Sequence, residues 1–543
     1  MVCAWKTIAT LKRARQIVPL RAQPSVRKPL ISQSVTRSPR LEHRVHIKGG
    51  WTTAHIPHSS VEDRERSYLD ILIFNEGDSE MKQMKQLCRL VFLGVLKLAL
   101  LPANAVAQST VNSYVLESPS LAKAQTACQT YGMTLVSTIR QPDTYLVTVS
   151  AAVPPMILEQ WVRNDPNVKH LELNHNVSVP ESKLTTTLYI PPMPVTTYAT
   201  GDLWVKTYGA TAWIGYVQQP AFYLTNTYQG GLQQHFTGNG IVAVIDTGVD
   251  PGNPILAPVL VPGYDFTRNV AGYASDLADI NQSTASILEQ STASILESLH
   301  VVQLNQSTAA ILEQSTASIL KSRPLPSYFG HGTMVAGLIH LVAPTAKIMP
   351  LKAFKADGTA NVSDVIRAIY YATDNGVNVI NMSFELPHIS DALVKAINYA
   401  TRRGVICVAS AGNEGQSGLV YPAAYGGVIG VAAVNQENKP SSFTNYGPDL
   451  VTVAAPGEAL ITTYPGKHYA AVWGTSFSAA LVSGATEDLL QAMNHDIVSQ
   501  VHSADIVRAL KHASACVTDG SMGAGCMDLK QAVQFIKGLN MPH

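Results

Sequence analysis

The sequence predicts an α/β protein: a large domain whose mainly parallel sheet is covered on both faces, preceded by a small α+β domain. Strand and helix signals alternate through the second half of the chain, an order that builds a parallel sheet between two helical layers. Before them, the order β-α-β-β-α-β between residues 114 and 179 is a known compact unit. Together these observations predict a three-layer domain with a smaller domain in front of it.

Composition allows a sizeable core and excludes some function classes. Hydrophobic residues make up 46% of the 543 residues, charged residues make up 14%, and the formal net charge is +1. A near-neutral chain without a long basic stretch in its later part gives no sign of a nucleic-acid groove. The six cysteines show neither a disulfide framework nor metal-ligand spacing. Cys516 and Cys526 either form a bridge or stay as two thiols, and Cys407, in an apolar run, is expected to be buried.

An export signal is predicted at residues 81–107. The segment 81–89 is basic, 90–101 is apolar, and Ala103-Asn104-Ala105 and Ala105-Val106-Ala107 have the small residues of cleavage sites. This is the order of a secretory signal peptide, and the apolar run is too short to span a membrane comfortably. A buried helix is the alternative, but it leaves the basic start and the small residues unexplained.

The position of that signal bears on where translation begins. Residues 1–80 start with a basic stretch and show no sustained periodicity. We expect them to be upstream sequence misassigned as protein, or disordered, with translation starting at Met81 or Met84; a transit peptide is the alternative. The mature protein is expected to be secreted, to an extracellular or periplasmic site, without a stable membrane anchor, because no second long apolar segment follows.

The small domain is expected at residues 108–183 and the large domain at 200–540. In the small domain, strands are predicted at 114–117, 135–139, 145–149 and within 168–179, and helices at 121–131, ended by Gly132, and 156–165. In the large domain, strands are predicted at 241–245, 347–354, 377–383 and 405–409, and helices at 364–375, capped by Ser363 and ended by Gly376, and 390–403.

A low-complexity repeat occupies residues 281–320. The segment 283–290 recurs from Ser291, and a second pair begins at Ser307 and Ser315. A period of eight would rotate the apolar face of an ideal helix by about 80° per repeat. The segment is therefore expected to be a surface insertion, loosely ordered or helical in pieces, without a chemical role.

Asp246 is the first candidate for chemistry. It ends the apolar strand 241–245, and the carboxyl end of such a strand faces the crevice where ligands bind in parallel sheets. Asp246-Thr247-Gly248 also matches the aspartic-protease signature, whose mechanism needs two facing copies. A homodimer could supply the second copy, so an aspartic-type protease is one alternative.

His331 and Ser476 complete a constellation with Asp246. His331 stands in the glycine-rich segment 330–337 at the start of a predicted helix, and Ser476 precedes a helix of small residues. A serine at such a position is also a common helix N-cap. Taken together, the chain order Asp, His, Ser is one of the known orders of a serine-protease triad.

From about Thr237 to Gly484 the chain resembles the subtilisin-like serine protease family. Besides the three motifs above, the segments 408–415, 421–423, 443–447 and 454–457 match its pattern. The resemblance implies that Ser476 is the nucleophile, His331 the general base and Asp246 its orienting partner, with Asn413 donating to the oxyanion. It further implies that substrate is bound by Ser383, Phe384, Glu385 and Gly412.

The resemblance also implies the wider function. Residues 108–183 resemble an inhibitory propeptide, whose tail after Val179, through Lys183, would lie in the cleft; an unrelated accessory domain is the alternative. The expected activity is that of a secreted serine endopeptidase that cleaves polypeptides through an acyl-enzyme. A catalytically inactive protease fold that binds other proteins is a further alternative.

Two departures from the family carry expectations. Glu385 stands where a glycine is usual, so it would narrow the cleft, favour basic substrate residues or point into solvent. The stretch Gly337 to Ala343 is too short for the loop that binds structural calcium in many relatives. No cofactor is expected to be required and no metal ligand is assigned, although calcium at another site is possible.

Overall fold

The computed structural model describes residues 44–47, 50–53, 111–180, 204–207, 210–227, 236–280, 302–303, 309–311, 325–386, 388–493, 500–512 and 520–539. The chain divides into two compact units, Met1–Val106 and Ala107–His543. In the first, β1 (Arg44–Ile47) and β2 (Gly50–Thr53) form an antiparallel hairpin. The predicted signal peptide at 81–107 lies outside the described residues.

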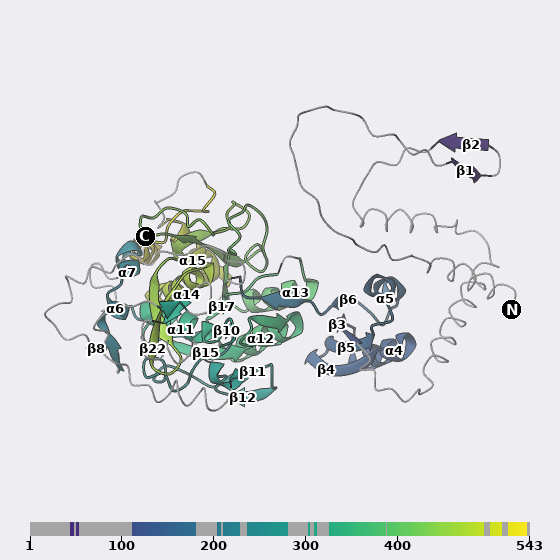
Figure 1. Ribbon diagram of the computed structural model, residues 1–543, viewed down its shortest axis with the longest axis horizontal. Coiled ribbons are helices and arrows are strands. Elements are labelled where there is room, and N and C mark those ends of the chain that lie inside the picture. Colours follow the sequence, from purple (N-terminus) through teal and green to yellow (C-terminus); the bar gives the residue numbers. More distant parts are fainter. Residues whose placement is uncertain are drawn as a thin grey trace, which may run out of the picture. The chain divides into compact units, whose positions relative to one another are not determined.

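The second unit begins with the small α+β domain that the sequence predicts. Its antiparallel sheet has the order β4-β5-β3-β6. Helix α4 begins after Ser120, whose Oγ accepts from the Lys123 amide, and ends at Gly132 with φ of 66°. The elements are β3 (Val111–Glu117), α4 (Leu121–Tyr131), β4 (Thr134–Arg140), β5 (Thr144–Ser150), α5 (Pro155–Val162) and β6 (His170–Leu173) (Figure 1).

The large domain is built on an eight-stranded sheet of order β12-β11-β15-β10-β17-β18-β19-β20, parallel except for the β11–β12 pair. Strand β10 is flanked by β15 on one side and β17 on the other. The strands are β10 (Ile241–Asp246), β11 (Gly263–Asp265), β12 (Val270–Gly272), β15 (Lys347–Lys352), β17 (Val379–Met382), β18 (Ile406–Ser410), β19 (Val428–Val434) and β20 (Val453–Pro456).

Helices cover both faces of this sheet, which confirms the predicted three-layer α/β fold (Figure 1). Along β10, Val242 and Val244 belong to the core shared with α11 (His331–Val342) and α14 (Thr475–Ala492). Ala243 and Ile245 belong to the opposite core, shared with α12 (Val362–Asp374) and α13 (Asp391–Arg402). A strand buried on both faces is expected to be a continuous apolar run, as β10 is from Ile241 to Ile245, before it ends at Asp246.

Shorter elements complete the large domain. They are β8 (Trp204–Thr207), β9 (Ala210–Trp213), α6 (Ile214–Val217), α7 (Pro220–Leu224), the 3₁₀ helix η4 (Asp276–Asp279), α15 (Gln500–His512) and α16 (Leu529–Leu539). Among the described residues, no helix combines the length and the apolar character needed to cross a membrane.

The repeat segment, expected to be loosely ordered or helical in pieces, contains two short strands among its described residues. Its described residues form β13 (Val302–Gln303) and β14 (Ala309–Ile311). Strand β14 pairs antiparallel with β22 (His468–Val472), which pairs in turn with β21 (Leu460–Tyr464). The Ala-Ala-Ile stretch therefore extends a sheet edge, and main-chain pairing decides its structure where the period of eight disfavours a helix.

The first residues of helices α12 and α13 correct the sequence prediction. Ser390, predicted as the first residue of the helix 390–403, is instead the N-cap of α13, since its Oγ accepts from the Leu393 amide. Ser363 does not cap α12: the N-cap is Asn361, at the end of β16 (Thr359–Asn361). The chain runs from that short strand directly into the helix, so the helix starts before Ser363 and includes it.

The cysteines partly resolve the question left by the sequence. Cys407 is fully buried, as predicted, and burial raises the pKa of its thiol to about 12. Cys526 is disulfide-bonded, and its partner lies outside the described residues.

The stretch from Gly337 to Val342 completes helix α11, leaving a short link to β15.

Candidate active site

Asp246 is the last residue of β10 and is almost completely buried. Its carbonyl oxygen accepts from the amides of Ala353 and Phe354, each at 3.1 Å, which fixes the backbone at the strand end. The chain passes from β10 to β15 on one side and later to β17 on the other. This reversal of strand order opens the crevice where parallel sheets bind ligands, and Asp246 lies at its edge.

His331 reaches Asp246 from the first position of α11. Gly330 precedes it with φ of 84°, a left-handed conformation that favours glycine. The imidazole Nδ1 lies 2.8 Å from Oδ1 and 3.0 Å from Oδ2 of Asp246, and both side chains are 1% exposed. A carboxylate that accepts from Nδ1 leaves Nε2 as the basic nitrogen of the ring.

Ser476 is the second residue of α14 and fully buried. The N-cap of this helix is Gly474, so the alternative role of Ser476 as the cap is wrong. None of the described residues hydrogen-bonds the Ser476 Oγ. The ring of the next residue, Phe477, packs on His331 with centroids 5.4 Å apart, which brings the start of α14 against the start of α11.

Asn413 is held beside the start of the same helix. Its Oδ1 accepts from both the amide (3.0 Å) and the hydroxyl (2.9 Å) of Thr475. The Thr475 hydroxyl in turn accepts from the Gly412 amide at 3.2 Å. Because the side-chain oxygen of Asn413 is engaged on this side, its amide NH₂ group is oriented the other way.

Ser383 links the substrate-binding segment to the serine. Its Oγ donates to the carbonyl oxygen of Ser476 at 3.1 Å and accepts from the Asn381 side chain at 2.9 Å. Phe384 is fully buried, with its ring 5.3 Å from that of Phe354. The segment predicted to bind substrate therefore follows β17 directly and lies against the start of α14.

A strand of the small domain lies along this segment. Strand β7 (Asn176–Ser178) pairs antiparallel with β16, and the amide and carbonyl of Ser178 pair with those of Glu385, at 3.3 and 2.8 Å. The Val179 amide donates to Gly358 at 3.1 Å. The pairing therefore starts at Asn176, before the tail that the sequence suggested, and residues 181–183 lie outside the described residues.

The side chain of Glu385 is buried, at 3% exposed, so the expectation of a solvated carboxylate is wrong. A Cβ on Gly412 would lie 2.9 Å from its Oε2 and 3.0 Å from Oε2 of Glu414. Asn445 Nδ2 donates to Glu414 at 2.6 Å. Two carboxylates therefore converge on Gly412, the residue before Asn413.

Sequence reasoning missed a group of polar residues behind the triad candidates. Thr247, Asp276 and Lys352 are all fully buried and hydrogen-bonded to one another or to the segments that follow Asp246 and His331. One local signal was available: Lys352 is a buried lysine that directly follows the apolar run Ile348–Leu351 of β15. The described residues contain no group of three or more His, Cys, Asp or Glu able to hold an ion.

Comparison with known proteins agrees with this geometry. Residues 238–529 match the model of the subtilase family, Peptidase_S8. Subtilisin BL of Lederbergia lenta is 41% identical over 165 residues, which are 29% of this chain and 61% of that protein. A thermophilic serine proteinase of Bacillus sp. (strain AK1) is 35% identical over 243 residues, covering 45% and 50%.

Among solved structures, fervidolysin of Fervidobacterium pennivorans, described as a keratinolytic enzyme related to subtilisin, superposes with a TM-score of 0.56 at 20% identity. The match covers 80% of this chain and 62% of fervidolysin, and it concerns the fold alone. This chain spans 61% of the length of subtilisin BL, with the triad candidates inside the matched family region. The chain belongs to the subtilase family.

Proposed function

We propose that this subtilase is an active serine endopeptidase, exported from the cell and made as an autoinhibited precursor. The observation that carries the proposal is the buried contact between Nδ1 of His331 and both carboxylate oxygens of Asp246, beside the helix start that holds Ser476. Asp246 orients the ring and stabilises its charged form, so Nε2 takes the proton of the Ser476 hydroxyl as that oxygen attacks the scissile carbonyl.

The reaction then passes through an acyl-enzyme. The tetrahedral intermediate places negative charge on the former carbonyl oxygen, and the NH₂ group of Asn413, oriented by Thr475, donates to it. His331 returns the proton to the leaving amine as the peptide bond breaks. Water, deprotonated by His331, attacks the acyl carbonyl. His331 then returns this proton to the Ser476 oxygen as the acyl–oxygen bond breaks and the second product leaves with a carboxyl end.

Replacing the nucleophile tests the activity. The wild-type chain, expressed from Met81, is expected to process itself and to cleave unfolded casein, and Ser476→Ala is expected to do neither. Equal behaviour of the two proteins would rule out Ser476 as the nucleophile. Absence of any turnover by wild type would favour a protease fold that only binds, whereas inhibition by aspartate-directed reagents alone would favour the aspartic alternative.

Replacing the proposed oxyanion donor tests the second element of the site. Asn413→Ala should lower kcat roughly 10²- to 10³-fold with little change in KM, the size of the loss known for such a donor in subtilisin. Asn375→Ala is the control, because Asn375 bonds only within the exposed end of α12. A kcat of Asn413→Ala within a few-fold of wild type would remove Asn413 from the mechanism.

The contacts of β7 support autoinhibition. An extended segment that adds to an exposed edge strand binds through main-chain hydrogen bonds, as a substrate does. In the antiparallel register that pairs Ser178 with Glu385, Pro180 faces Ser383. Proline has no amide proton to donate there, so this segment occupies the groove with one hydrogen bond fewer than a substrate could make.

The carboxylates near Gly412 support a preference for a basic residue before the scissile bond. Glu385 and Glu414 supply two negative charges beside the oxyanion donor, and a Lys or Arg side chain would complement them. Glu385→Gly should lower the kcat/KM ratio of lysyl over leucyl peptides about tenfold, a difference equivalent to about 1.4 kcal/mol. Glu437→Gln, at an exposed ion pair, is the control, and an unchanged ratio in Glu385→Gly would refute the preference.

Export rests on the basic, apolar and small-residue order of residues 81–107. Expression from Met81 in a secreting host should release the protein into the medium, and sequencing of its N-terminus should place signal cleavage after Ala105 or Ala107. Retention of the unprocessed chain inside the cells would contradict export.

A further inference from the structure

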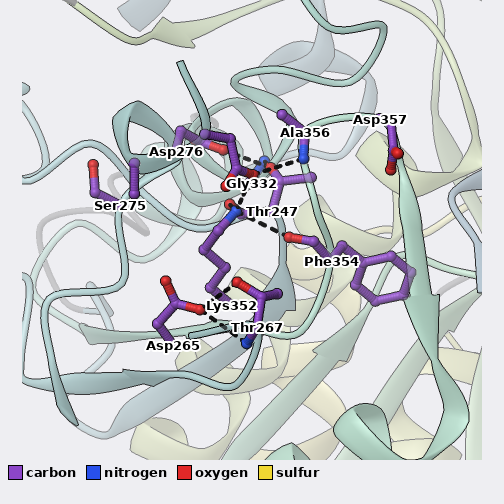
Figure 2. A network of polar contacts seen from close by, with 12 residues as sticks. Thr247, Asp265, Thr267, Ser275, Asp276, Gly332, Lys352, Phe354, Ala356 and Asp357 are labelled. Atoms are coloured by element: carbon purple, nitrogen blue, oxygen red, sulfur yellow. Dashed lines mark hydrogen bonds and ion pairs between the residues drawn. The ribbon is translucent and has the colours of Figure 1, made fainter. Parts of the chain in front are cut away.

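A buried carboxylate behind the catalytic pair connects the two segments that carry it. Oδ1 of Asp276 accepts from the Thr247 hydroxyl at 2.6 Å, and Oδ2 accepts from the amide (3.1 Å) and hydroxyl (2.6 Å) of Thr333. Figure 2 shows Asp276, Thr247 and Gly332 meeting at one point, with the Lys352 side chain reaching toward them from below. Asp276 is fully buried.

Two hydrogen-bond partners fix the direction in which the Thr247 hydroxyl points its proton. It donates to Asp276 and accepts from the amide of Gly332 at 3.0 Å. Thr247 directly follows Asp246, and Gly332 directly follows His331. The chain of bonds from Gly332 through Thr247 to Asp276 therefore ties the backbone beside Asp246 to the backbone beside His331.

Close packing makes this tie sensitive to small displacements. A Cβ added to Gly332 would lie 2.1 Å from the carbonyl oxygen of Gly248, so the two backbone segments are in direct contact. Segments at this separation cannot move closer, and the polar bonds oppose their moving apart. Loss of one bond would let His331 shift relative to Asp246.

Lys352 supports the same segment from the neighbouring strand. It lies opposite Asp246 in the β10–β15 register, and its Nζ donates to the Thr247 carbonyl, to Phe354 O at 3.0 Å and to Asp279 Oδ2 at 2.6 Å (Figure 2). Burial raises the pKa of Asp276 to about 6, while the charge of Lys352 and the two hydroxyls act in the opposite direction. Asp276 is thus ionised at neutral pH and accepts on both oxygens.

We propose that Asp276 is a positioning residue, which holds the hydrogen bond between Asp246 and His331 in its reactive geometry through Thr247 and Thr333. The inference rests on the proposed triad. It assigns a role in catalysis to a residue that does not touch the substrate, 30 positions beyond Asp246 in the chain.

Asp276→Asn is the first test, because it keeps the shape and replaces one accepting oxygen by a donor. An amide NH₂ group cannot accept from a hydroxyl, so either the Thr247 bond or the Thr333 bonds are lost. In the full chain, kcat toward a chromogenic peptide should fall roughly tenfold to a hundredfold at a nearly constant KM. The proton resonance of His331 Nδ1–H, which reports its bond to Asp246, should shift or broaden.

Two threonine variants keep the proposal testable if Asp276→Asn does not fold. Thr247→Val removes the hydroxyl and should reproduce the loss of kcat and the altered resonance, whereas Thr247→Ser should restore both. Thr373→Val is the control: its hydroxyl is also buried and bonds only within α12, to Ile369 O at 2.7 Å. It should change stability without changing kcat.

The outcomes separate this inference from the proposed function. If wild type is inactive, the proposed function fails, and the Nδ1–H resonance alone then decides whether Asp276 and Thr247 position His331. If wild type is active and folded Asp276→Asn, or Thr247→Val, keeps kcat and the resonance of wild type, the positioning role is refuted. The same holds if Thr247→Ser is as impaired as Thr247→Val.

Discussion

Two carboxylates meet the first turn of a helix in this molecule, and different domains supply them. Asp276 belongs to the large domain and accepts from the amide and hydroxyl of Thr333 in α11. Glu172 belongs to the small domain and accepts from the Ser390 hydroxyl at 2.6 Å and the Asp391 amide at 2.9 Å, at the start of α13. Both satisfy donors that a helix start leaves without partners inside the helix.

Their pKa values move in opposite directions. For Asp276, burial is the largest influence and raises the pKa to about 6. For Glu172, burial also acts to raise the pKa, but the hydrogen bonds from His170 and Ser390 outweigh it and lower the pKa. The hydrogen bonds that Asp276 accepts lie within one domain. Those that Glu172 accepts connect two domains and are better hydrated.

A second helix start on the same face also depends on the small domain. Asn174 Oδ1 accepts from the Ser363 amide at 2.9 Å, and the carbonyl of His175 accepts from the Val362 amide at 2.9 Å. The small domain therefore completes the first turns of both α12 and α13. Without it these amides would have to be satisfied by water.

The largest expected effect is a difference in stability between variants that lack one or the other of the two carboxylates. In the inactive Ser476→Ala chain, Asp276→Ala should lower the free energy of unfolding by about 3 kcal/mol or more, because two hydroxyls and an amide lose a buried acceptor. Glu172→Ala should cost about half as much, since water can replace it. Thermal and denaturant unfolding measure both, and equal losses would erase the distinction.

The next effect concerns release of the small domain. Glu172→Gln keeps the shape but removes the charge from the bonds to Ser390 and Asp391, a loss of about 1.5 kcal/mol. The lag before peptide-cleaving activity appears in the full chain should shorten roughly tenfold, with the final kcat unchanged. Glu159→Gln, in helix α5, is the matched control. An unchanged lag would show that Glu172 does not hold the domain.

The sequence predicted the local parts of this arrangement well. Strand β10 ending at Asp246, helix α11 starting at His331 and the helix stop at Gly132 all depend on neighbouring residues, and the structure has each of them. The pairing of Asp276 with Thr333 and of Glu172 with Ser390 spans 57 and 218 positions. No local pattern encodes such partners, because only the completed fold brings them together.

Ser363 is a second case in which a local sequence pattern does not reveal a distant partner. Its residue type and position before a helical pattern favoured a cap, yet the amide it carries is itself capped by Asn174 of the small domain. The cap is supplied across 189 positions, so a local search assigned the role to the wrong side chain.

A smaller effect is expected from Arg140, at the other end of the contact between the domains. Its Nη1 lies 2.9 Å from Asp374 Oδ2, and its guanidinium lies over the rings of Tyr370 and Tyr399, at 4.3 and 3.8 Å. Because Asp374 is half exposed, Arg140→Ala should shorten the activation lag only about threefold. Arg163→Ala, on the exposed end of α5, should leave it unchanged, and equal lags for both variants would remove this contact from the docking energy.

The smallest effect is a dependence of docking on pH through His170. Its Nε2 lies 3.3 Å from Glu172 Oε2 and 3.6 Å from Asp391 Oδ2 of the large domain. The bond to Glu172 is the main cause that raises the pKa of His170, burial opposes it, and the charge of Asp391 adds to the rise. Since Asp391 favours the protonated ring only in the docked state, its contribution is complete below pH 6.5 and disappears as the pH rises through the raised pKa.

Raising the pH should therefore weaken the docking of the small domain. This effect can be measured separately from any pH dependence that His331 gives to catalysis. The ratio of the activation lag of His170→Gln to that of wild type cancels any dependence that both share. This ratio should be lowest in mildly acidic buffer and should rise toward one, by about twofold, as the pH passes the raised pKa of His170. His175→Gln should give a flat ratio. A flat ratio for His170→Gln as well would show that His170 does not make the docking depend on pH.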